Sequence, residues 1–276
     1  MNPVEKALWF IESHFAQELT LDAIAAMGGV SRFYMTRAFG MTTGHSIMRY
    51  VRGRRLTEAA RQLAQGAPDI LGVAIDAGYG SHEAFTRAFR EQFGLTPEAV
   101  RTQRHLDNLI LVEPIKMSET LPVNLAKPVV TDGKTLLLVG LAERYTCDTG
   151  AAIPAQWQKF GPYLGRVPGQ LDGVAYGVCY NLDDAYNYDY LCGVEVADFS
   201  KLTAEFSRLR IPAHRYLVFQ HREHISAIRS SWNFIWTKGV PESGHETADA
   251  PFFERYGTDF DMRTGNGGVE LWVPIR

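Results

Sequence analysis

The sequence predicts a multidomain α and α+β protein, in which an all-α domain is followed by an α+β domain. Two internal repeats support this prediction: one pattern recurs within the first third of the chain, and another recurs within the remainder. Between them the apolar spacing changes from a helical period to a mixture of strands and helices. We expect the all-α domain at 1–106, a linker at 107–125 and the α+β domain at 126–276.

The first repeat has the order of elements that is typical of a helix-turn-helix. In each copy a short apolar helix leads to a glycine turn, a serine stands where an N-cap is expected, and a second helix follows. The residues Gly28, Ser31, Arg37, Ala38, Phe39 and Gly44 recur as Gly78, Ser81, Arg87, Ala88, Phe89 and Gly94. Two such units predict an all-α double helix-turn-helix domain that sets two helices into successive major-groove segments of DNA.

Apolar periodicity and end signals give the elements of both domains. The predicted helices of the first domain are 4–16, 21–27, 32–41, 45–65, 70–77, 82–93 and a short helix that starts at Pro97. A proline-interrupted linker at 109–128 follows. In the second domain we expect strands at 135–145, 173–180, 190–197, 214–221, 252–256 and 268–274, with helices at 151–164, 201–209 and 224–238. This order contains the unit β-α-β-β twice.

The outward faces of the two second helices carry the candidate base-reading residues. They are Arg32, Phe33, Thr36 and Arg37 in the first unit, and His82, Glu83, Thr86 and Arg87 in the second. An arginine can bind guanine O6 and N7 with both ends of its guanidinium, which supplies ~1–3 kcal/mol of discrimination. Glu83 either accepts a hydrogen bond from cytosine or repels the backbone, and Phe33 either contacts a thymine methyl or packs on its own helix.

The charge pattern is consistent with DNA as the partner. The chain has a net charge of -3, yet the segment from Ser31 to Arg61 carries seven arginines against a single acid, Glu58. Such a local excess of positive charge is either a phosphate footprint or a solvated face, and the neighbouring repeat favours the footprint. Phosphate or solvent, rather than bases, is the expected contact of Arg49, Arg52, Arg54 and Arg55.

The second repeat predicts a ligand concavity in the α+β domain. Trp157 recurs as Trp232, and at the same offset Glu195 recurs as Glu270. If helices cover one side of the sheet, strand alternation turns both glutamates to the other side, among aromatic residues. The candidate ligand-binding residues are Tyr176, Tyr180, Glu195, Glu270 and Trp272.

Aromatic walls around a carboxylate suit a small, amphipathic or cationic effector. The alternative is that each glutamate pairs with a protein donor such as Arg144, Arg215 or Arg222. The helix tryptophans Trp157, Trp232 and Trp236 lie on apolar stripes and are expected in the core.

No motif indicates an enzyme. The sequence has no GxSxG elbow, no HExxH pair and no phosphate-binding glycine loop. His221 and His224 form the closest approach to a metal site, and they lack a third ligand. We therefore expect no catalytic residue, no metal and no cofactor. A hydrolytic domain or a protein-interaction module in the second half is the alternative.

Composition points to a cytoplasmic protein without a membrane partner. The three cysteines form no CxxC pair, the N-terminus lacks the layout of a signal peptide, and no window reaches the ~18 apolar residues of a membrane span.

The first hundred residues resemble the AraC/XylS-type regulators, and most of all the subgroup typified by MarA, SoxS and Rob. The resemblance lies in the run Gly44-His45-Ser46-Ile47-Met48-Arg49-Tyr50-Val51-Arg52-Gly53-Arg54-Arg55-Leu56. It also lies in Gly78-Tyr79, Ser81, Phe85, Phe89, Phe93-Gly94, Thr96-Pro97 and Arg101. It covers about residues 4–104 and implies a seven-helix DNA-binding domain, in which Arg37 is the strongest base reader of the first recognition helix.

The second half resembles the gyrase-inhibitor-like effector domains. Its motifs are Tyr190-Leu191-Cys192-Gly193-Val194-Glu195, Pro251-Phe252-Phe253-Glu254-Arg255-Tyr256 and Val269-Glu270-Leu271-Trp272-Val273-Pro274-Ile275. Such domains occur in multidrug-sensing regulators and, behind an AraC-type domain, in Rob. The two resemblances together imply a transcription regulator that binds double-stranded DNA and a small-molecule effector, with RNA polymerase as a further partner. They identify neither the operator, nor the effector, nor which glutamate lies in the pocket.

Overall fold

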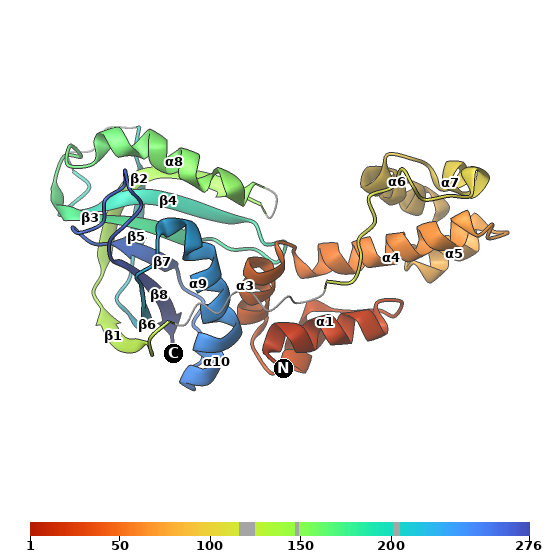
Figure 1. Ribbon diagram of the computed structural model, residues 1–276, viewed down its shortest axis with the longest axis horizontal. Helices are drawn as coiled ribbons and strands as arrows, with labels where there is room; N and C mark the ends of the chain where they lie inside the picture. The colour runs from red at the N-terminus through yellow and green to blue at the C-terminus, as the bar shows by residue number, and fades with distance from the viewer. Residues whose placement is uncertain (116–124, 147–148, 201–204) are drawn as a thin grey trace. The chain divides into compact units, whose positions relative to one another are not determined.

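The computed structural model describes residues 1–115, 125–146, 149–200 and 205–276. Contacts divide the chain into two compact units. The first contains Pro3–Met35 and His45–Ser118, and the second contains Thr36–Gly44 and Glu119–Arg276. The elements of both are labelled in Figure 1. The predicted class, an all-α region followed by an α+β region, is confirmed.

Seven helices cover the first hundred described residues, and each corresponds to a predicted one. They are α1 (Pro3–His14), α2 (Leu21–Gly28), α3 (Arg32–Thr43), α4 (Ile47–Ala64), α5 (Ile70–Asp76), α6 (His82–Phe93) and α7 (Pro97–Gln103). The predicted caps are present: the hydroxyls of Thr20, Ser31 and Ser81 accept hydrogen bonds from backbone N–H groups three residues on.

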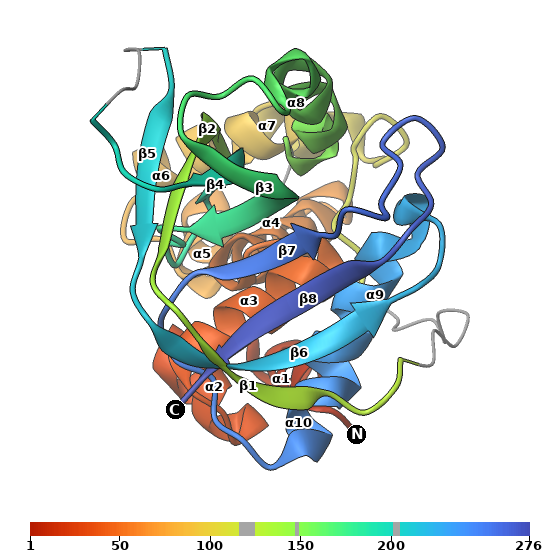
Figure 2. The ribbon, with the colours of Figure 1, turned by 90° about the vertical axis from the view of Figure 1, so that its left-hand side faces the viewer.

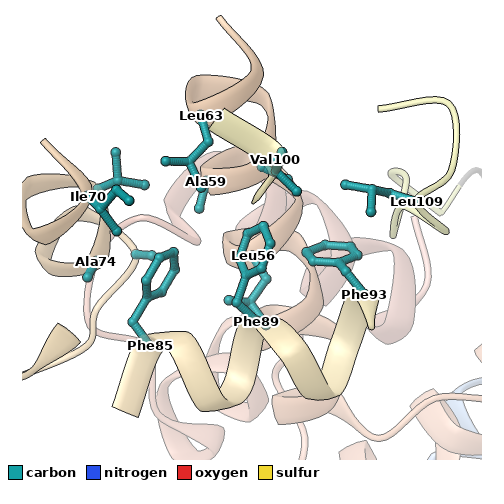
Figure 3. Close-up of a cluster of buried hydrophobic side chains, with 13 residues drawn as sticks. Leu56, Ala59, Leu63, Ile70, Ala74, Phe85, Phe89, Phe93, Val100 and Leu109 are labelled. Carbon is teal, nitrogen blue, oxygen red and sulfur yellow. The ribbon is translucent and has the colours of Figure 1, made fainter. Parts of the chain in front are cut away.

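Three phenylalanines of α6 hold the second helix-turn-helix together. Phe85, Phe89 and Phe93 follow one another along one face, with ring centroids 5.4 and 4.8 Å apart. They pack against Leu56 and Leu63 of α4 and side chains of α5 and α7, as Figure 3 shows. The amphipathic spacing therefore buries one face of α6 and leaves the other for a partner.

The segment after α7 lies along α4. Thr57 accepts a hydrogen bond from the backbone N–H of Val112, and the Val112 carbonyl accepts one from Arg54. Arg54 also binds both carboxylate oxygens of Glu12 on α1, at 3.0 and 3.2 Å. A Cβ at Gly53 would lie 2.8 Å from the Val112 side chain, so glycine permits this close packing.

The second unit is built on one eight-stranded antiparallel sheet with the order β1-β6-β8-β7-β3-β4-β2-β5 (Figure 2). The strands are β1 (Val129–Gly133), β2 (Leu136–Tyr145), β3 (Gln170–Tyr180), β4 (Tyr188–Val196), β5 (Ser207–Ile211), β6 (His214–His221), β7 (Phe252–Tyr256) and β8 (Val269–Ile275). Its main helices are α8 (Ile153–Phe160), α9 (Ile228–Phe234), the π-helical continuation Ile235–Gly239 and α10 (Val240–Ser243).

The duplicated β-α-β-β order is present, but the offset that relates Trp157 to Trp232 is too short for the strands. β1 and β2 begin at 129 and 136, and their counterparts β5 and β6 begin at 207 and 214. Leu138 pairs with Glu195 in the first repeat, and its counterpart Tyr216 pairs with Pro274 in the second. Glu195 therefore corresponds to Pro274, not to Glu270.

Two predictions in this unit are corrected. The strand β1 was not expected, because its Val129 and Val130 are exposed at the edge of the sheet and give no buried pattern. The helix expected at 201–209 is wrong from Ser207 onwards, where β5 pairs with β2. Backbone pairing with a sheet edge overrides the weak helical period of this segment; residues 201–204 lie outside the described part of the chain.

Each face of the sheet has its own core. On one side, Val139, Tyr190, Cys192 and Val194 pack with Phe160 of α8. The opposite side gathers Tyr176, Leu191, Tyr216 and Phe253 with other apolar residues. Trp157 of α8 donates to the Tyr190 hydroxyl, Tyr190 donates to Glu254, and Trp232 of α9 donates to the same carboxylate. Both helices therefore lie on the first side.

Candidate DNA-recognition helices and effector site

The outward face of α6 carries the predicted side chains. His82, Glu83 and Arg87 are exposed and Thr86 is half-buried, while Phe85 and Phe89 of the same helix are fully buried. Arg87 makes no ion pair within the part of the chain that the structure describes. The planar guanidinium of Arg87, with its several N–H donors, is therefore accessible to an acceptor outside this unit.

Glu83 lies at the N-terminus of α6 and acts as part of the cap. Hydrogen bonds from its own backbone N–H and from the Ser81 hydroxyl hold the pKa of Glu83 below its ordinary value. A negative charge is favourable at a helix N-terminus. This arrangement gives Glu83 a role in the helix itself, whichever of its two predicted relations to DNA applies.

The residues of α3 are divided between exposed and buried positions. Arg32 is exposed and lies 3.4 Å from Asp22, and Phe33 is half-buried. Thr36 and Arg37 were expected to face outward, and in the structure they are 4 and 2 % exposed.

Arg37 belongs to the second compact unit, as do its partners there. Its Nη2 donates to the Ala250 carbonyl at 3.0 Å, and its guanidinium stands 4.6 Å from the centroid of the Phe252 ring. Burial lowers the pKa of Arg37 to about 9. The spacing of residues along α3 indicates helix faces within one domain only and carries no signal for this environment. The reading of bases by Thr36 and Arg37 stays a prediction.

Two of the four arginines expected to contact phosphate or solvent, Arg49 and Arg55, have different environments. Arg49 is exposed. Arg55 is half-buried, and its guanidinium donates to the carbonyls of Phe15 and Gln17 just beyond α1. Carbonyls at the end of a helix lack helical donors, and a cation there is favourable. The guanidinium of Arg55 is therefore engaged within the domain, and its phosphate contact stays a prediction.

Replacing Arg55 with Ala is expected to lower the free energy of unfolding of the full chain by about 2 kcal/mol, because two charge-assisted hydrogen bonds are lost. Urea unfolding measures this effect. Arg52→Ala, on the same helix but exposed, is the matched control and should change stability by less than about 0.5 kcal/mol. A stability equal to that of the parent chain, together with a smaller salt slope of DNA binding, would restore the phosphate role.

All five predicted effector residues lie on the face of the sheet opposite α8 and α9. Tyr176 and Trp272 pack there with Tyr180, and Glu195 and Glu270 belong to the same face by strand alternation. The Phe253 ring stacks on Trp272 with centroids 5.2 Å apart. The aromatic side chains thus pack on one another as core.

Both predicted glutamates have protein partners. Glu195 accepts from Lys134 Nζ at 2.7 Å. Glu270 accepts from Arg255 Nη1 at 3.2 Å and from the Trp272 indole at 3.0 Å. The alternative of pairing is therefore what the structure has, with donors other than those expected: Arg144 binds Asp183 and Asp189, and Arg215 lies near Asp132.

A third glutamate, Glu254, occupies the opposite face under α8 and α9. Its Oε2 accepts from the hydroxyls of Tyr190 at 2.9 Å and Tyr256 at 2.8 Å, and its Oε1 accepts from the Trp232 indole at 2.9 Å. The Trp157 indole donates in turn to the Tyr190 hydroxyl at 2.9 Å. Each of the two pseudo-equivalent helices thus contributes a tryptophan to one network.

Glu254 has no cationic partner among the described residues. Three neutral donors surround it, and the residue is half-buried, so the site retains some access from solvent. Desolvation raises the pKa of Glu254 above its ordinary value of 4.5, although its hydrogen bonds oppose this effect. A carboxylate held among aromatic rings without a counter-charge is the part of this unit best suited to a cationic ligand.

Glu254 lies within a sequence motif but was not among the predicted site residues. The available signal was alternation: in β7, Phe252, Glu254 and Tyr256 share one face, which places an acid between two aromatic residues on a mostly buried strand. The apparent repeat of Glu195 and Glu270 directed attention to the opposite face of the sheet. Trp232 and Trp236 lie in the core as expected, at 3 and 0 % exposed, and the indoles of Trp157 and Trp232 also donate hydrogen bonds in this network.

The two parts of the chain match two protein families. Residues 24–103 match a helix-turn-helix domain family, and residues 128–276 match the family described as GyrI-like small molecule binding domain. The transcriptional regulator Rob of Salmonella typhimurium is 35 % identical over 99 % of this chain and 98 % of its own length.

Two relatives from Escherichia coli K12 are also similar. The right origin-binding protein is 26 % identical over 99 % of this chain and 98 % of its own length. The regulatory protein SoxS is 36 % identical over 36 % of this chain and 92 % of its own length. No helix in residues 1–115, 125–146, 149–200 or 205–276 combines the length and apolar character needed to cross a bilayer.

Proposed function

Because this chain belongs to the AraC-type transcription regulators that carry a C-terminal GyrI-like small-molecule-binding domain, we propose that an amphipathic organic cation bound at Glu254 controls its binding to a specific DNA site. An effector of this class is consistent with a multidrug-sensing role. RNA polymerase is the further partner that control of transcription requires. Because its DNA site lies in the cytoplasm, the protein acts there.

The observation that carries the effector proposal is the environment of Glu254. Desolvating a carboxylate is costly, and three neutral hydrogen bonds offset only part of that cost. A ligand cation supplies the missing positive charge, and the rings of Trp157, Trp232 and Tyr256 supply faces for its apolar body. Glu195 and Glu270 have such a charge already, which argues against them as the pocket carboxylate.

The DNA proposal rests on the two helix-turn-helix units, with residues 1–106 as the DNA-binding part. Helices α3 and α6 enter adjacent major-groove segments, so one chain contacts two elements of an asymmetric operator. We assign base contacts to side chains at the start of each helix and a phosphate contact to Arg49. The base-contacting residues are Arg32, Phe33, His82, Thr86 and Arg87, joined by Thr36 and Arg37 once the contacts that bury them are released; Glu83 belongs to the cap of α6.

Selection of bound sequences from random DNA tests the proposal with the full chain. The cation N-methylacridinium and the uncharged, similarly shaped acridine serve as probes, because they separate charge from shape. We expect one enriched site with two conserved elements, about one helical turn apart, whose recovery changes with N-methylacridinium and not with acridine at neutral pH. Enrichment of no sequence would remove the DNA proposal, and equal effects of both probes would remove the cationic effector.

The raised pKa of Glu254 predicts a pH dependence of stability. The folded chain holds this proton more tightly than the unfolded chain, so the stabilisation is full below pH 4.5 and is lost as pH rises through the folded-state pKa. Glu254→Gln carries no ionising group, so its free energy of unfolding should rise relative to that of the parent chain as pH increases. Urea unfolding at several pH values measures the difference, and a constant difference would contradict the assignment.

A further inference from the structure

A glycine lies directly opposite Glu254 in the sheet. β3 and β7 pair at the centre of the strand order, and in their register Gly177 faces Glu254. A Cβ built on Gly177 would overlap the Tyr190 hydroxyl and would lie 2.7 Å from Oε2 of Glu254. Gly177 does not adopt a positive φ, so its backbone does not demand glycine. What glycine provides at position 177 is the space that a side chain would otherwise fill.

The pseudo-two-fold relation explains why this space occurs at one point. In the first repeat Tyr176 pairs with Gly193, and in the second Phe253 pairs with Trp272. By the strand correspondence given above, Tyr176 and Phe253 are counterparts, and the next residues, Gly177 and Glu254, are counterparts too. Because they also face each other, both lie at the pseudo-two-fold axis, where two side chains compete for one volume.

Resting on the proposed effector function of Glu254, we infer that Gly177 is a positioning residue of that site, which lets Tyr190 reach Glu254 and so determines which carboxylate oxygen meets the effector. Tyr190 comes from the first repeat and Glu254 from the second, and their hydrogen bond passes through the volume that Gly177 leaves open.

The hydrogen bonds single out one oxygen for the effector. Each carboxylate oxygen offers about two acceptor positions. Oε2 uses both, for Tyr190 and Tyr256, whereas Oε1 uses one, for Trp232. The cation therefore approaches Oε1 on the side of Trp232. The site suits an organic cation with a single positive charge, since no second carboxylate among the described residues joins this network.

Gly177→Ala in the full chain tests the inference, with Gly161→Ala as the matched control because a Cβ at Gly161 meets nothing within 4 Å. Fluorescence titration with N-methylacridinium should show a loss of affinity of about 10-fold or more for Gly177→Ala, because Glu254 without its Tyr190 donor is no longer held with Oε1 toward the cation; this is the size of one hydrogen bond to a charged group. Gly161→Ala should bind as the parent chain does. Unchanged affinity in Gly177→Ala would overturn the inference.

A double-mutant cycle with Tyr190→Phe shows whether Gly177 acts through the tyrosine hydroxyl. If it does, the losses from Gly177→Ala and Tyr190→Phe will not add, because both remove the same hydrogen bond. Additive losses would overturn the inference. Should Gly177→Ala fail to fold, Tyr190→Phe alone tests the inference, because it removes the same hydrogen bond without adding a Cβ; an unchanged affinity for N-methylacridinium would overturn it.

A measurement without any effector separates this inference from the proposed function. Carboxyl carbon NMR follows the titration of Glu254 directly. Loss of the Tyr190 donor should raise the pKa of Glu254 further in Gly177→Ala and in Tyr190→Phe, but not in Gly161→Ala. If this shift appears while the parent chain does not bind N-methylacridinium, the positioning role stands and the cationic effector falls. If the cation binds but the pKa shift of Glu254 is absent, the cationic effector stands and the positioning role of Gly177 falls.

Discussion

Replacing Glu254 with Gln is expected to weaken the binding of N-methylacridinium by roughly 30-fold, which corresponds to about 2 kcal/mol. The substitution keeps the shape of the side chain and removes the charge that faces the ligand cation. Isothermal titration calorimetry of the full chain measures this loss. Acridine, which is uncharged at neutral pH, should bind both chains with similar affinity, because it gains nothing from the carboxylate.

Glu270→Gln is the matched control for this prediction. Glu270 lies on the opposite face of the sheet and already accepts from Arg255 and Trp272. Its replacement should change the affinity for N-methylacridinium by less than about twofold, since exposed or half-exposed ion pairs contribute little. A large loss from Glu270→Gln together with an unchanged Glu254→Gln would move the site to the face first predicted from the sequence.

Replacing Arg87 with Ala is expected to weaken binding to the selected operator by about 10- to 100-fold and to relax selectivity at one base position. Arg87 is exposed on α6 and unpaired within the described residues, so its guanidinium is available to a guanine. Competition binding against operators with single-base changes measures both effects.

Arg87→Lys separates base reading from phosphate contact. Lysine keeps the charge but loses the planar fork that binds two acceptors of one guanine. We expect Arg87→Lys to resemble Arg87→Ala in selectivity while it retains the salt dependence of the parent chain. If Arg87→Lys restores both affinity and selectivity, Arg87 contacts phosphate instead.

The helical part of the chain was predictable because its signals are local. The caps at Thr20, Ser31 and Ser81 and the phenylalanine stripe of α6 fix the helix boundaries. Each of these signals is made by residues only a few positions apart in sequence. Such signals do not depend on the rest of the fold. The strands β6 and β7 were likewise predicted to the residue, because turns and buried runs bound them closely.

What the sequence did not reveal depends on contacts between distant segments. β5 is a strand because it pairs with β2, which lies far earlier in the chain. Arg55 serves the end of α1 and Arg37 contacts Phe252, and no spacing rule contains either contact. Glu254 becomes notable only once Tyr190 and Trp232 are seen to converge on it. The class of ligand was predicted from an aromatic-acidic pattern, whereas the identity of its carboxylate required the fold.

The most direct test of a DNA-binding protein controlled by a cation at Glu254 is operator affinity with and without saturating N-methylacridinium, in the parent chain and in Glu254→Gln. Binding at two linked sites is reciprocal, so an effector that responds to the DNA state must change operator affinity. We predict a change of about fivefold or more in the parent chain, the lower end of typical coupling, and none in Glu254→Gln. The same change in both chains, or no change in a parent chain that binds the cation, would contradict the account.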